Sequence, residues 1–575
     1  MIAFEPWDGR YVVRIGNLSF SQSTFMVLAA ILVGIGGGFG AVAFRALIAA
    51  AGSLAFGAIG GFLSRHVGPI GIVLQLALGG TIAAFVASRF APEATGHGVP
   101  EVMEAVALRG GNIRPRVIAV KALASATSIG FGGSCGREGP IVQIGSAIGS
   151  VLGQFAHAPP PIVRTLVACG AAAGISATFN APIGGVFFAS EVILGEFAPR
   201  SFAAIVVASV VSAVIGRSFL GNHPSFSAVG FALVSPFELV LYALLGAIAA
   251  LWAMGFVNLL YAIEDWFERL RIPAWSKGAI GFGSVGIIGI WFPQVFGVGY
   301  GAIQQVFYSH VPAAHALTLS VLKPLATSLT LGGGGSGGVF APSLFTGAFL
   351  GDGFGSLAHH VFPSWTGPAA AYGLVGMAAV FAAASEAPIT AIMIVFEMSD
   401  DYTIILPLMV AVVIATLLGR RLLGSTVYER KLLRRGLDWQ RIRNPQVFGR
   451  ISVSQVGRTP PLVAQANQTI HSLALDGEGS TELALPVCDG DRFVGIVNLA
   501  DVARGLAAGN GERTVGTITF PAKGALSPGD TLERAATLMA DPHAPLLPVI
   551  ADGDHLVSIV TRRDLLSAYR SVIAT

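Results

Sequence analysis

The chain has 575 residues, of which 53% are hydrophobic and only 12% are charged, about half the roughly 25% of an average soluble protein. So few charges cannot cover a water-soluble surface of this size, which excludes an ordinary cytosolic enzyme. The net charge of +3 includes no basic block that spans a domain, which excludes a nucleic-acid binder. Three scattered cysteines, Cys135, Cys169 and Cys488, exclude a disulfide scaffold and offer no metal cluster.

Residues 1–24 are polar and mixed, without the layout of a signal peptide. Apolar runs then follow one another from Phe25 to Leu423. One span needs about 20 apolar residues, so this stretch predicts well over ten helices. Glycine and proline cut many runs into pieces too short to cross alone, which is typical of broken helices around a binding site. We therefore expect a cytoplasmic segment over 1–24 and a membrane domain over 25–425.

A basic linker follows over residues 426–450. Its positive side chains are Arg430, Lys431, Arg434, Arg435, Arg441 and Arg443. By the positive-inside rule they place the end of the membrane domain in the cytoplasm, and Arg10 and Arg14 place the N-terminus on the same side. The sequence thus predicts a multi-pass protein of the cell's inner membrane with both termini cytoplasmic.

Residues 451–575 have the pattern of a soluble α/β domain. Short β-like runs (LALPVCD, FVGIVN, LLPVIAD, LVSIVT) are followed by helix-like runs (LADVARGLA, RRDLLSAY). The two closing segments, FVGIVNLADVARGL and LVSIVTRRDLLSAY, are parallel in pattern. They predict a duplicated unit over about 451–507 and 513–573.

An internal repeat is visible within the membrane domain. GAAAGISATFNAPIGGVFFASEV (170–192) resembles GMAAVFAAASEAPITAIMIVFEM (376–398), 206 residues further on. Upstream, GREGP (136–140) and GVFAP (338–342) form a second pair, 202 residues apart. Two homologous halves with a site between them at the midplane are a frequent plan of transporters. The repeat alone does not specify whether the halves are parallel or inverted.

Three pentads share the form G-x-x-x-P: GHGVP (96–100), GREGP (136–140) and GVFAP (338–342). Glycine permits a close backbone approach and proline suits a first helical turn, so each pentad predicts the start of an embedded helix. Backbone N–H groups there lack partners, and the helix dipole is positive. One such pentad would be an ordinary helix start, but three predict converging helix ends that bind an anion without a full positive charge.

Glu138, within GREGP, is the strongest single candidate for a functional residue. A carboxylate in an apolar, glycine-rich stretch is costly and suggests function. When ionised it could occupy the anion site itself, and when protonated it would lose that attraction and leave, which describes a gate and a proton carrier. The alternative is a salt bridge with Arg137 or Lys121, although adjacent residues on a helix rarely face each other.

On these motifs, residues 25–425 resemble the CLC chloride channel and transporter family. GHGVP is similar to the family's GSGIP, GREGP matches its GREGP/GKEGP motif, and GVFAP resembles its GIFAP. The resemblance implies an all-α polytopic membrane domain with two inverted-topology repeats and broken helices, assembled as a homodimer with one pore per subunit. It implies that Glu138 is the gating glutamate. It also implies that chloride or a similar anion is bound around His97, Gly98, Arg137, Gly139, Val339, Phe340 and Tyr402, the last lying in DDYTIILP.

Two positions depart from the family pattern. His97 stands where the family usually has serine, so either its imidazole donates to the anion or it turns aside and only the backbone binds. This leaves the preference for chloride open. Val192 stands where family exchangers carry the inner proton-transfer glutamate, and valine cannot carry a proton. The loss favours a passive anion channel, with a chloride/proton antiporter as the alternative, since a chain of water could replace the glutamate.

The tail resembles a pair of CBS domains, which often bind adenine nucleotides. Thr561 and Asp564 match the family's ribose-contacting S/T-x-x-D pattern, whereas in the first unit Asn498 precedes Asp501 where serine or threonine is expected. The pair therefore either binds ATP or another adenine nucleotide or serves as a structural dimerisation module.

The sequence gives little support for other classes of function. No H-E-x-x-H or His/Cys cluster with metal spacing suggests a membrane enzyme, and no G-K dipeptide is present for the phosphate loop of an ATP-driven pump. We therefore expect no enzyme, no required cofactor and no metal. A receptor that binds an anion without passing it remains an alternative, which a flux assay separates.

Overall fold

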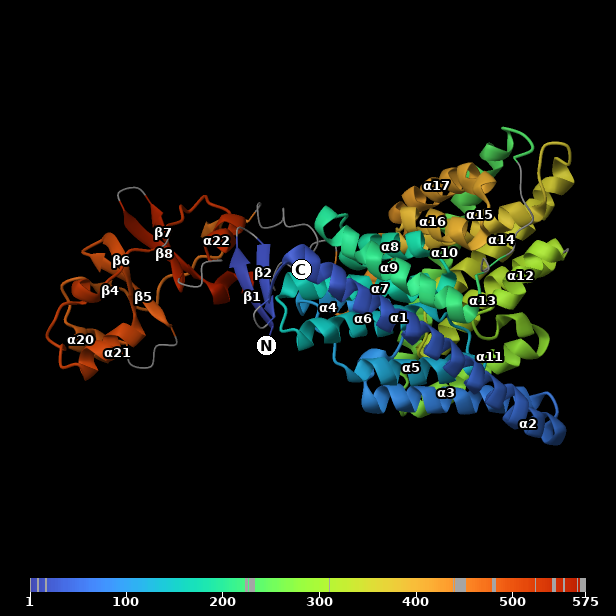
Figure 1. Ribbon diagram of the computed structural model, residues 1–575, viewed down its shortest axis with the longest axis horizontal. Helices are drawn as coiled ribbons and strands as arrows, with labels where there is room; N and C mark the ends of the chain where they lie inside the picture. The colour runs from blue at the N-terminus through green and yellow to red at the C-terminus, as the bar shows by residue number, and fades with distance from the viewer. Residues whose placement is uncertain are drawn as a thin grey trace. The chain divides into compact units, whose positions relative to one another are not determined.

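The computed structural model divides the chain into two compact units, residues 1–431 and 432–575 (Figure 1). The residues it describes are 2–7, 10–15, 18–222, 226, 233–309, 311–437, 439, 451–477, 482–522, 524–539, 544–551, 554–565 and 567–568. Arg441 and Arg443 of the predicted basic linker lie outside these residues.

The chain opens with a three-stranded antiparallel sheet, which the polar N-terminal sequence did not predict. Its strands are β1 (Ile2–Trp7), β2 (Arg10–Ile15) and β3 (Leu18–Ser21). The Phe4 ring packs edge-on against Phe25, 5.2 Å between centroids. Ser21 caps the first helix by accepting a hydrogen bond from the backbone N–H of Thr24 at 3.2 Å. The first helix therefore begins at Gln22, three residues before the predicted start.

The rest of the first unit is helical, and its two halves repeat one order of elements. The first half contains α1 (Gln22–Gly52), the π-helix η1 (Ser53–Ile59), α2 (Gly60–Val67), α3 (Ile70–Phe90), η2 (Pro92–Ala94), α4 (Val99–Leu108), α5 (Arg116–Gly130), α6 (Glu138–Phe155), α7 (Pro160–Phe179), α8 (Pro182–Phe188), the π-helix η3 (Ala189–Leu194) and α9 (Pro199–Leu220). The second half contains α10 (Glu238–Arg269), α11 (Ala274–Trp291), η4 (Pro293–Val295), α12 (Tyr300–Tyr308), α13 (Ala313–Gly332), α14 (Phe340–Val361), α15 (Ala369–Ser385), α16 (Pro388–Ser399), η5 (Tyr402–Ile404) and α17 (Ile405–Leu423). The short helix α18 (Glu429–Arg434) follows.

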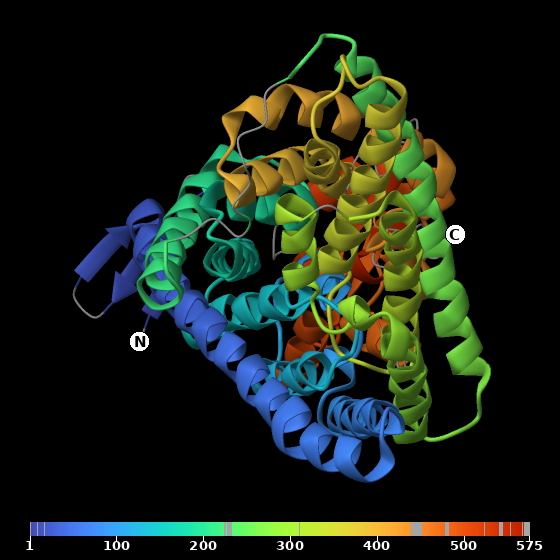
Figure 2. The same cartoon turned by 90° about the vertical axis from the view of Figure 1, so that its right-hand side faces the viewer.

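Among the described residues, six helical stretches are long and apolar enough to cross a membrane. They are Gln22–Val67, Ile70–Phe90, Pro160–Phe179, Ser201–Leu220, Glu238–Arg269 and Tyr402–Leu423. Figure 2 shows the longest single helix, α10, along one edge of the helical unit. Some of the other helices are too short to span. For example, α4 has 10 residues, about 15 Å of rise against a hydrocarbon core of about 30 Å. The predicted mixture of spanning and broken helices is present.

The two halves meet through reciprocal helix caps. The Glu191 carboxylate, in η3 after α8, accepts from Thr390 N at 2.9 Å and Thr390 Oγ1 at 2.6 Å in the first turn of α16. The Glu397 carboxylate, near the end of α16, accepts from Ile183 N at 3.0 Å and Gly184 N at 2.6 Å in the first turn of α8. Because each helix end contacts the start of the other, these repeat-related segments run antiparallel. This arrangement agrees with inverted halves.

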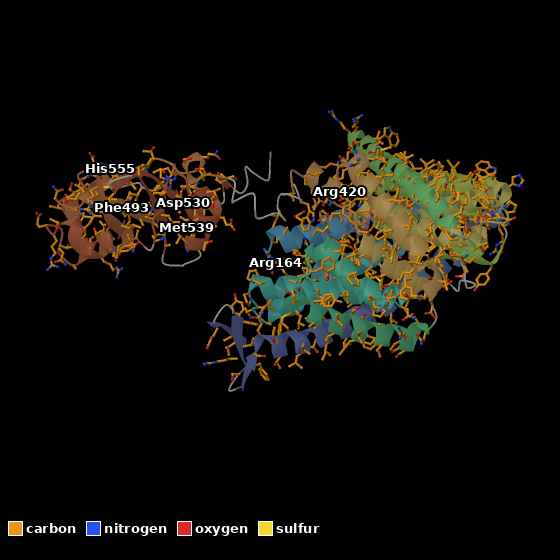
Figure 3. The ribbon with its side chains drawn as sticks, turned by 90° about the horizontal axis from the view of Figure 1, so that it is seen from above. Arg164, Arg420, Phe493, Asp530, Met539 and His555 are labelled. Carbon is orange, nitrogen blue, oxygen red and sulfur yellow. The ribbon has the colours of Figure 1, made fainter. Side chains whose placement is uncertain are left out.

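Basic side chains lie near the end of the helical unit. Arg420 extends from the last turn of α17 and pairs with Glu386 at 3.0 Å (Figure 3). Glu386 is itself the left-handed residue that ends α15, with φ 51°. A cation in the last turn is favourable because the helix dipole is negative there.

The second unit contains a five-stranded mixed sheet, in the order β4-β5-β6-β8-β7. Its strands are β4 (Ala464–Gln465), β5 (Ala484–Asp489), β6 (Arg492–Asn498), β7 (Leu546–Ala551) and β8 (His555–Thr561), and its helices are α20 (Ile470–Asp476), α21 (Leu499–Ala507) and α22 (Leu532–Leu538). The four predicted β-like runs correspond to β5–β8. Phe493 and His555, labelled in Figure 3, lie on the neighbouring inner strands β6 and β8. Val497 and Val560 each belong to a separate buried apolar cluster, which is consistent with a pair of CBS units.

Candidate functional site

The three G-x-x-x-P pentads meet in space, and each precedes or opens a helix: α4, α6 and α14. Gly136 and Gly338 exchange two backbone hydrogen bonds of 2.7 Å. Gly96 donates to the Gly335 carbonyl at 3.1 Å and accepts from Gly337 N at 3.2 Å. These bonds join loops that are about 200 or more residues apart in sequence, so the predicted convergence of helix starts is present.

Close backbone contact explains the glycines of these loops. Gly98, the residue before α4, has φ +85°, which favours glycine. A Cβ on Gly139 would overlap the carbonyl oxygen of His97. The first turns of α4 and α6 can therefore lie this close only without side chains at these two positions.

Two buried lysines hold the approaching loops through backbone carbonyls. Lys121 donates to the carbonyls of Ala94 and Gly96 at 2.9 and 2.8 Å. Lys323, 202 residues later, donates to those of Val295 and Gly297 at 2.9 and 2.8 Å. The alternative prediction of a Lys121–Glu138 salt bridge therefore finds no support, because the Lys121 ammonium is turned to backbone carbonyls.

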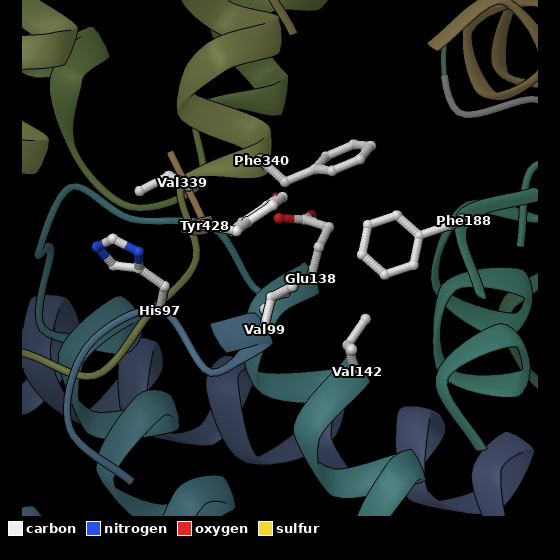
Figure 4. Close-up of a pocket in the computed structure, with 9 residues that line it drawn as sticks. His97, Val99, Glu138, Val142, Phe188, Val339, Phe340 and Tyr428 are labelled. Carbon is white, nitrogen blue, oxygen red and sulfur yellow. The ribbon is translucent and has the colours of Figure 1, made fainter. Parts of the chain in front are cut away.

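A narrow pocket lies at the meeting point of the helix starts (Figure 4). It is lined by His97, Val99, Glu138, Gly139, Val142, Phe188, Val339, Phe340 and Tyr428. Five of these were predicted from the sequence. Glu138 and Phe340 occupy equivalent positions of the two halves, 202 residues apart, and Figure 4 shows them facing the same space. The Gly98 and Arg137 positions immediately precede α4 and α6 and so adjoin the pocket.

Glu138 is buried, with 1% of its surface exposed, and is the first residue of α6. Its Oε1 accepts a hydrogen bond from the Tyr300 hydroxyl. Its Oε2 and the backbone nitrogen of Ala341, in the first turn of α14, both lie close to Gly136. The carboxylate thus stands where the positive ends of two helix dipoles would attract an anion. The predicted alternative, a pair with Arg137, is only a 3.9 Å contact between Arg137 Nε and Glu138 Oε1.

The structure corrects the assignment of the pocket tyrosine. Tyr402 is 72% exposed in the turn η5 and does not line the pocket, whereas Tyr428 is 2% exposed and does. The two tyrosines lie on either side of α17, whose 19 residues extend about 28 Å. The structure therefore does not bring Tyr402 to the pocket that Glu138 lines. The only signal for Tyr428 in the sequence was its place a few residues after the last long apolar run, which is α17 in the structure.

The two departures from the family pattern differ in their placement. His97 is 1% exposed and lines the pocket, and its ring lies 6.2 Å from that of Tyr261. Val192 is 7% exposed in η3 and lies outside the pocket, although Phe188 of the preceding helix lines it. An ionisable group thus stands at the pocket in place of serine, and an aliphatic one stands where exchangers carry a carboxylate.

The residues predicted to contact a nucleotide form hydrogen bonds with other residues of the second unit. Asp564 Oδ2 accepts from Thr561 N at 2.9 Å and Thr561 Oγ1 at 2.6 Å. Arg458 Nε donates to both oxygens of Asp564 at 3.0 Å, and its Nη2 donates to Glu482 at 2.6 Å. In the first unit of the pair, Asn498 Nδ2 donates to Asp501 at 3.1 Å. A ribose at Asp564 would therefore have to compete with Arg458.

Comparisons with known proteins support the same division. Residues 79–420 match the family described as voltage gated chloride channel, and residues 525–571 match the CBS domain. The H(+)/Cl(-) exchange transporter ClcA of Cronobacter sakazakii is 35% identical over 382 residues, covering 64% of this chain and 80% of that protein. A protein of Ralstonia nicotianae, named as a ClcB-like chloride channel protein, is 36% identical over 352 residues. The match covers 60% of this chain and 81% of that protein.

Solved structures share the fold. A slow cyanobacterial Cl-/H+ antiporter is 27% identical, with a TM-score of 0.67, over 71% of this chain and 97% of that one. A eukaryotic CLC transporter, at 21% identity and a TM-score of 0.70, covers 95% of this chain and 99% of that one, which extends the shared fold through the C-terminal unit. The predicted helical membrane fold with a C-terminal CBS region is confirmed.

Proposed function

Because the chain belongs to the voltage gated chloride channel (CLC) family, we propose that it exchanges chloride or a similar small anion for protons across a membrane. The observation that carries this proposal is the buried Glu138 carboxylate at the converging starts of α6 and α14. Relatives named as H(+)/Cl(-) exchange transporters support exchange over the passive channel that the sequence favoured.

The geometry suggests how one residue serves both ions. When ionised, Glu138 occupies the helix starts and competes with an anion for the same dipoles and N–H groups. When protonated, it loses that attraction, so an anion can take its place. One carboxylate thus alternates between carrying a proton and yielding its position to an anion. His97 and Tyr428, which line the same pocket, are proposed to contact that anion together with the backbone of Gly98, Gly139, Val339 and Phe340.

A passive anion channel is the second candidate, and Val192 is the observation that favours it. Valine has no proton to give, so a relay on the inner side must use another group or water. The two candidates share the pocket and the gate, and they differ only in whether protons move with the anion.

Liposomes that contain the full-length protein separate the candidates. Chloride efflux and proton uptake are recorded together, with a chloride gradient and no proton gradient at the start. We expect chloride efflux to drive protons inward and so to build a proton gradient. Efflux without proton uptake would establish the channel, and binding of chloride without efflux would point to a receptor.

Glu138→Gln provides the matched control in the same assay. Glutamine keeps the size of the side chain but cannot ionise, so we expect chloride flux that is independent of pH and uncoupled from protons. If flux through this variant stayed pH-gated, the gating role of Glu138 would be wrong.

Several wider features complete the proposal. We propose a homodimer with one pore in each subunit, in the inner membrane of the cell, with both termini in the cytoplasm. Adenine nucleotide such as ATP could bind the CBS pair near Asp564 and Thr561, with Asp501 as the weaker counterpart.

A further inference from the structure

A fourth loop approaches the gate from the second half of the chain. GVGYG (297–301) lies 201 residues after GHGVP, one residue less than the interval between GREGP and GVFAP, and it lacks the proline of the other pentads. Gly299 has φ +89° and precedes α12, as Gly98 with φ +85° precedes α4. Lys323 holds this loop as Lys121 holds the loop before α4. The loop therefore places Tyr300, the first residue of α12, at a position equivalent to the pocket-lining Val99.

The ring of Tyr300 is fixed between other rings and a guanidinium. Its centroid lies 5.6 Å from that of Phe226 and 6.2 Å from that of Phe179. The guanidinium carbon of Arg137 lies 5.1 Å from the ring centroid. In this setting the hydroxyl donates to Glu138 Oε1. The donor is therefore held on the carboxylate by packing on several sides.

We propose that Tyr300 is a positioning residue that holds the ionised Glu138 in its closed place and so sets how readily the gate opens. A hydrogen bond to an ionised carboxylate is about twice as strong as one to a neutral group. Protonation of Glu138 therefore weakens the bond at the same moment that it weakens the attraction to the helix starts. The inference rests on the proposed function, because it assigns a control on the same gate.

Several titratable or charged groups, Tyr300 among them, interact electrostatically with Glu138 or line the same pocket. They are Cys135, Arg137, Lys323, Tyr300, His97 and Tyr428. Among these, Tyr300 donates a side-chain hydrogen bond to the carboxylate, so its removal is expected to act most directly on the closed position.

Tyr300→Phe tests the inference, since it removes the hydroxyl and keeps the ring. In liposomes we expect chloride flux about tenfold faster at neutral pH, from the loss of a bond to a charged group. At acid pH, where the wild-type gate is already protonated, we expect little change. The pH at half-maximal flux should therefore rise by about one unit. Tyr308→Phe, at the exposed end of the same helix, is the matched control and should behave as wild type.

The double variant Tyr300→Phe/Glu138→Gln separates this inference from the proposed function. If Tyr300 acts through Glu138, the double variant transports no faster than Glu138→Gln alone. An equal acceleration in both backgrounds, or an unchanged pH profile in Tyr300→Phe, would overturn the role of Tyr300 while leaving the gate intact. A pH-gated Glu138→Gln variant would instead overturn the gate itself.

A second variant keeps the inference testable if Tyr300→Phe does not fold. Incorporation of 3-fluorotyrosine at position 300 preserves shape and makes the phenol a stronger donor. We then expect slower flux at neutral pH and a lower pH of half-maximal flux. A faster or unchanged variant would contradict the inference.

Discussion

The reciprocal caps Glu191 and Glu397 should stabilise the membrane unit by a measurable amount. Each carboxylate accepts backbone N–H groups at the start of the repeat-related helix, at 2.6–3.0 Å for Glu397. A hydrogen bond to a charged group contributes about 1.5–3 kcal/mol, against roughly 1 kcal/mol for a neutral one. Glu397→Gln keeps one acceptor and turns an N–H₂ donor toward the other N–H. We therefore expect a loss of about 2–4 kcal/mol.

Buried cysteines provide the assay for this prediction. Cys135 and Cys169 are free and fully buried in the helical unit, so a thiol-reactive dye reports its unfolding on heating. Cys488→Ser removes the signal of the second unit. With an unfolding entropy of about 2.1 cal/mol/K per residue over roughly 400 residues, the loss should lower Tm by about 2–5 °C.

The two caps are equivalent in the two halves, so a second variant provides an independent test. Glu191→Gln should lower Tm by a similar amount, and the two effects should add, because the caps lie at opposite ends of α16. Asp400→Asn, an acid-to-amide change at an exposed residue just after α16, is the control and should leave Tm unchanged. Two variants that both melt within 1 °C of the parent would refute the stabilising role of the caps.

Further predictions concern the pocket and the tail. Tyr428→Phe should weaken chloride binding or alter selectivity among anions in flux assays, whereas Tyr402→Phe should not; the reverse result would restore the assignment made from sequence. Gly139→Ala should abolish transport because its Cβ would meet a backbone carbonyl, while Gly255→Ala, with open space around it, should transport normally. Arg458→Ala should tighten ATP binding by the full-length protein severalfold in titration calorimetry, and no binding by either protein would favour a purely structural CBS pair.

Local signals in the sequence predicted the framework of the site. Glycine and proline at fixed spacing identified three helix starts, and the buried carboxylate of Glu138 stood out by its cost in an apolar stretch. These features are encoded within a few residues, so no knowledge of the packing was needed. The β-like runs of the tail were predicted for the same reason, since each alternates or clusters apolar residues over the length of one strand.

Features that depend on the return path of the chain were not predictable in this way. Tyr402 and Tyr428 both follow apolar helices, and only tertiary structure shows which of them is buried at the pocket. Tyr300 escaped notice because its loop lacks proline, although the repeat interval would have pointed to it. The N-terminal sheet was missed because its strands are short and alternate with charged residues, glycine and proline, which resembles a linker.

Glu138 and Phe340 occupy equivalent positions of the two halves, and the difference between them has one more consequence. A pore built from two identical inverted halves would look the same from either side of the membrane and could not tell one direction from the other. Here a carboxylate stands on one half and a phenyl ring at the equivalent place on the other. This unmatched pair, together with Val99 and Tyr300 at the starts of α4 and α12, makes the two halves chemically different at the site, so the site is sided rather than symmetric.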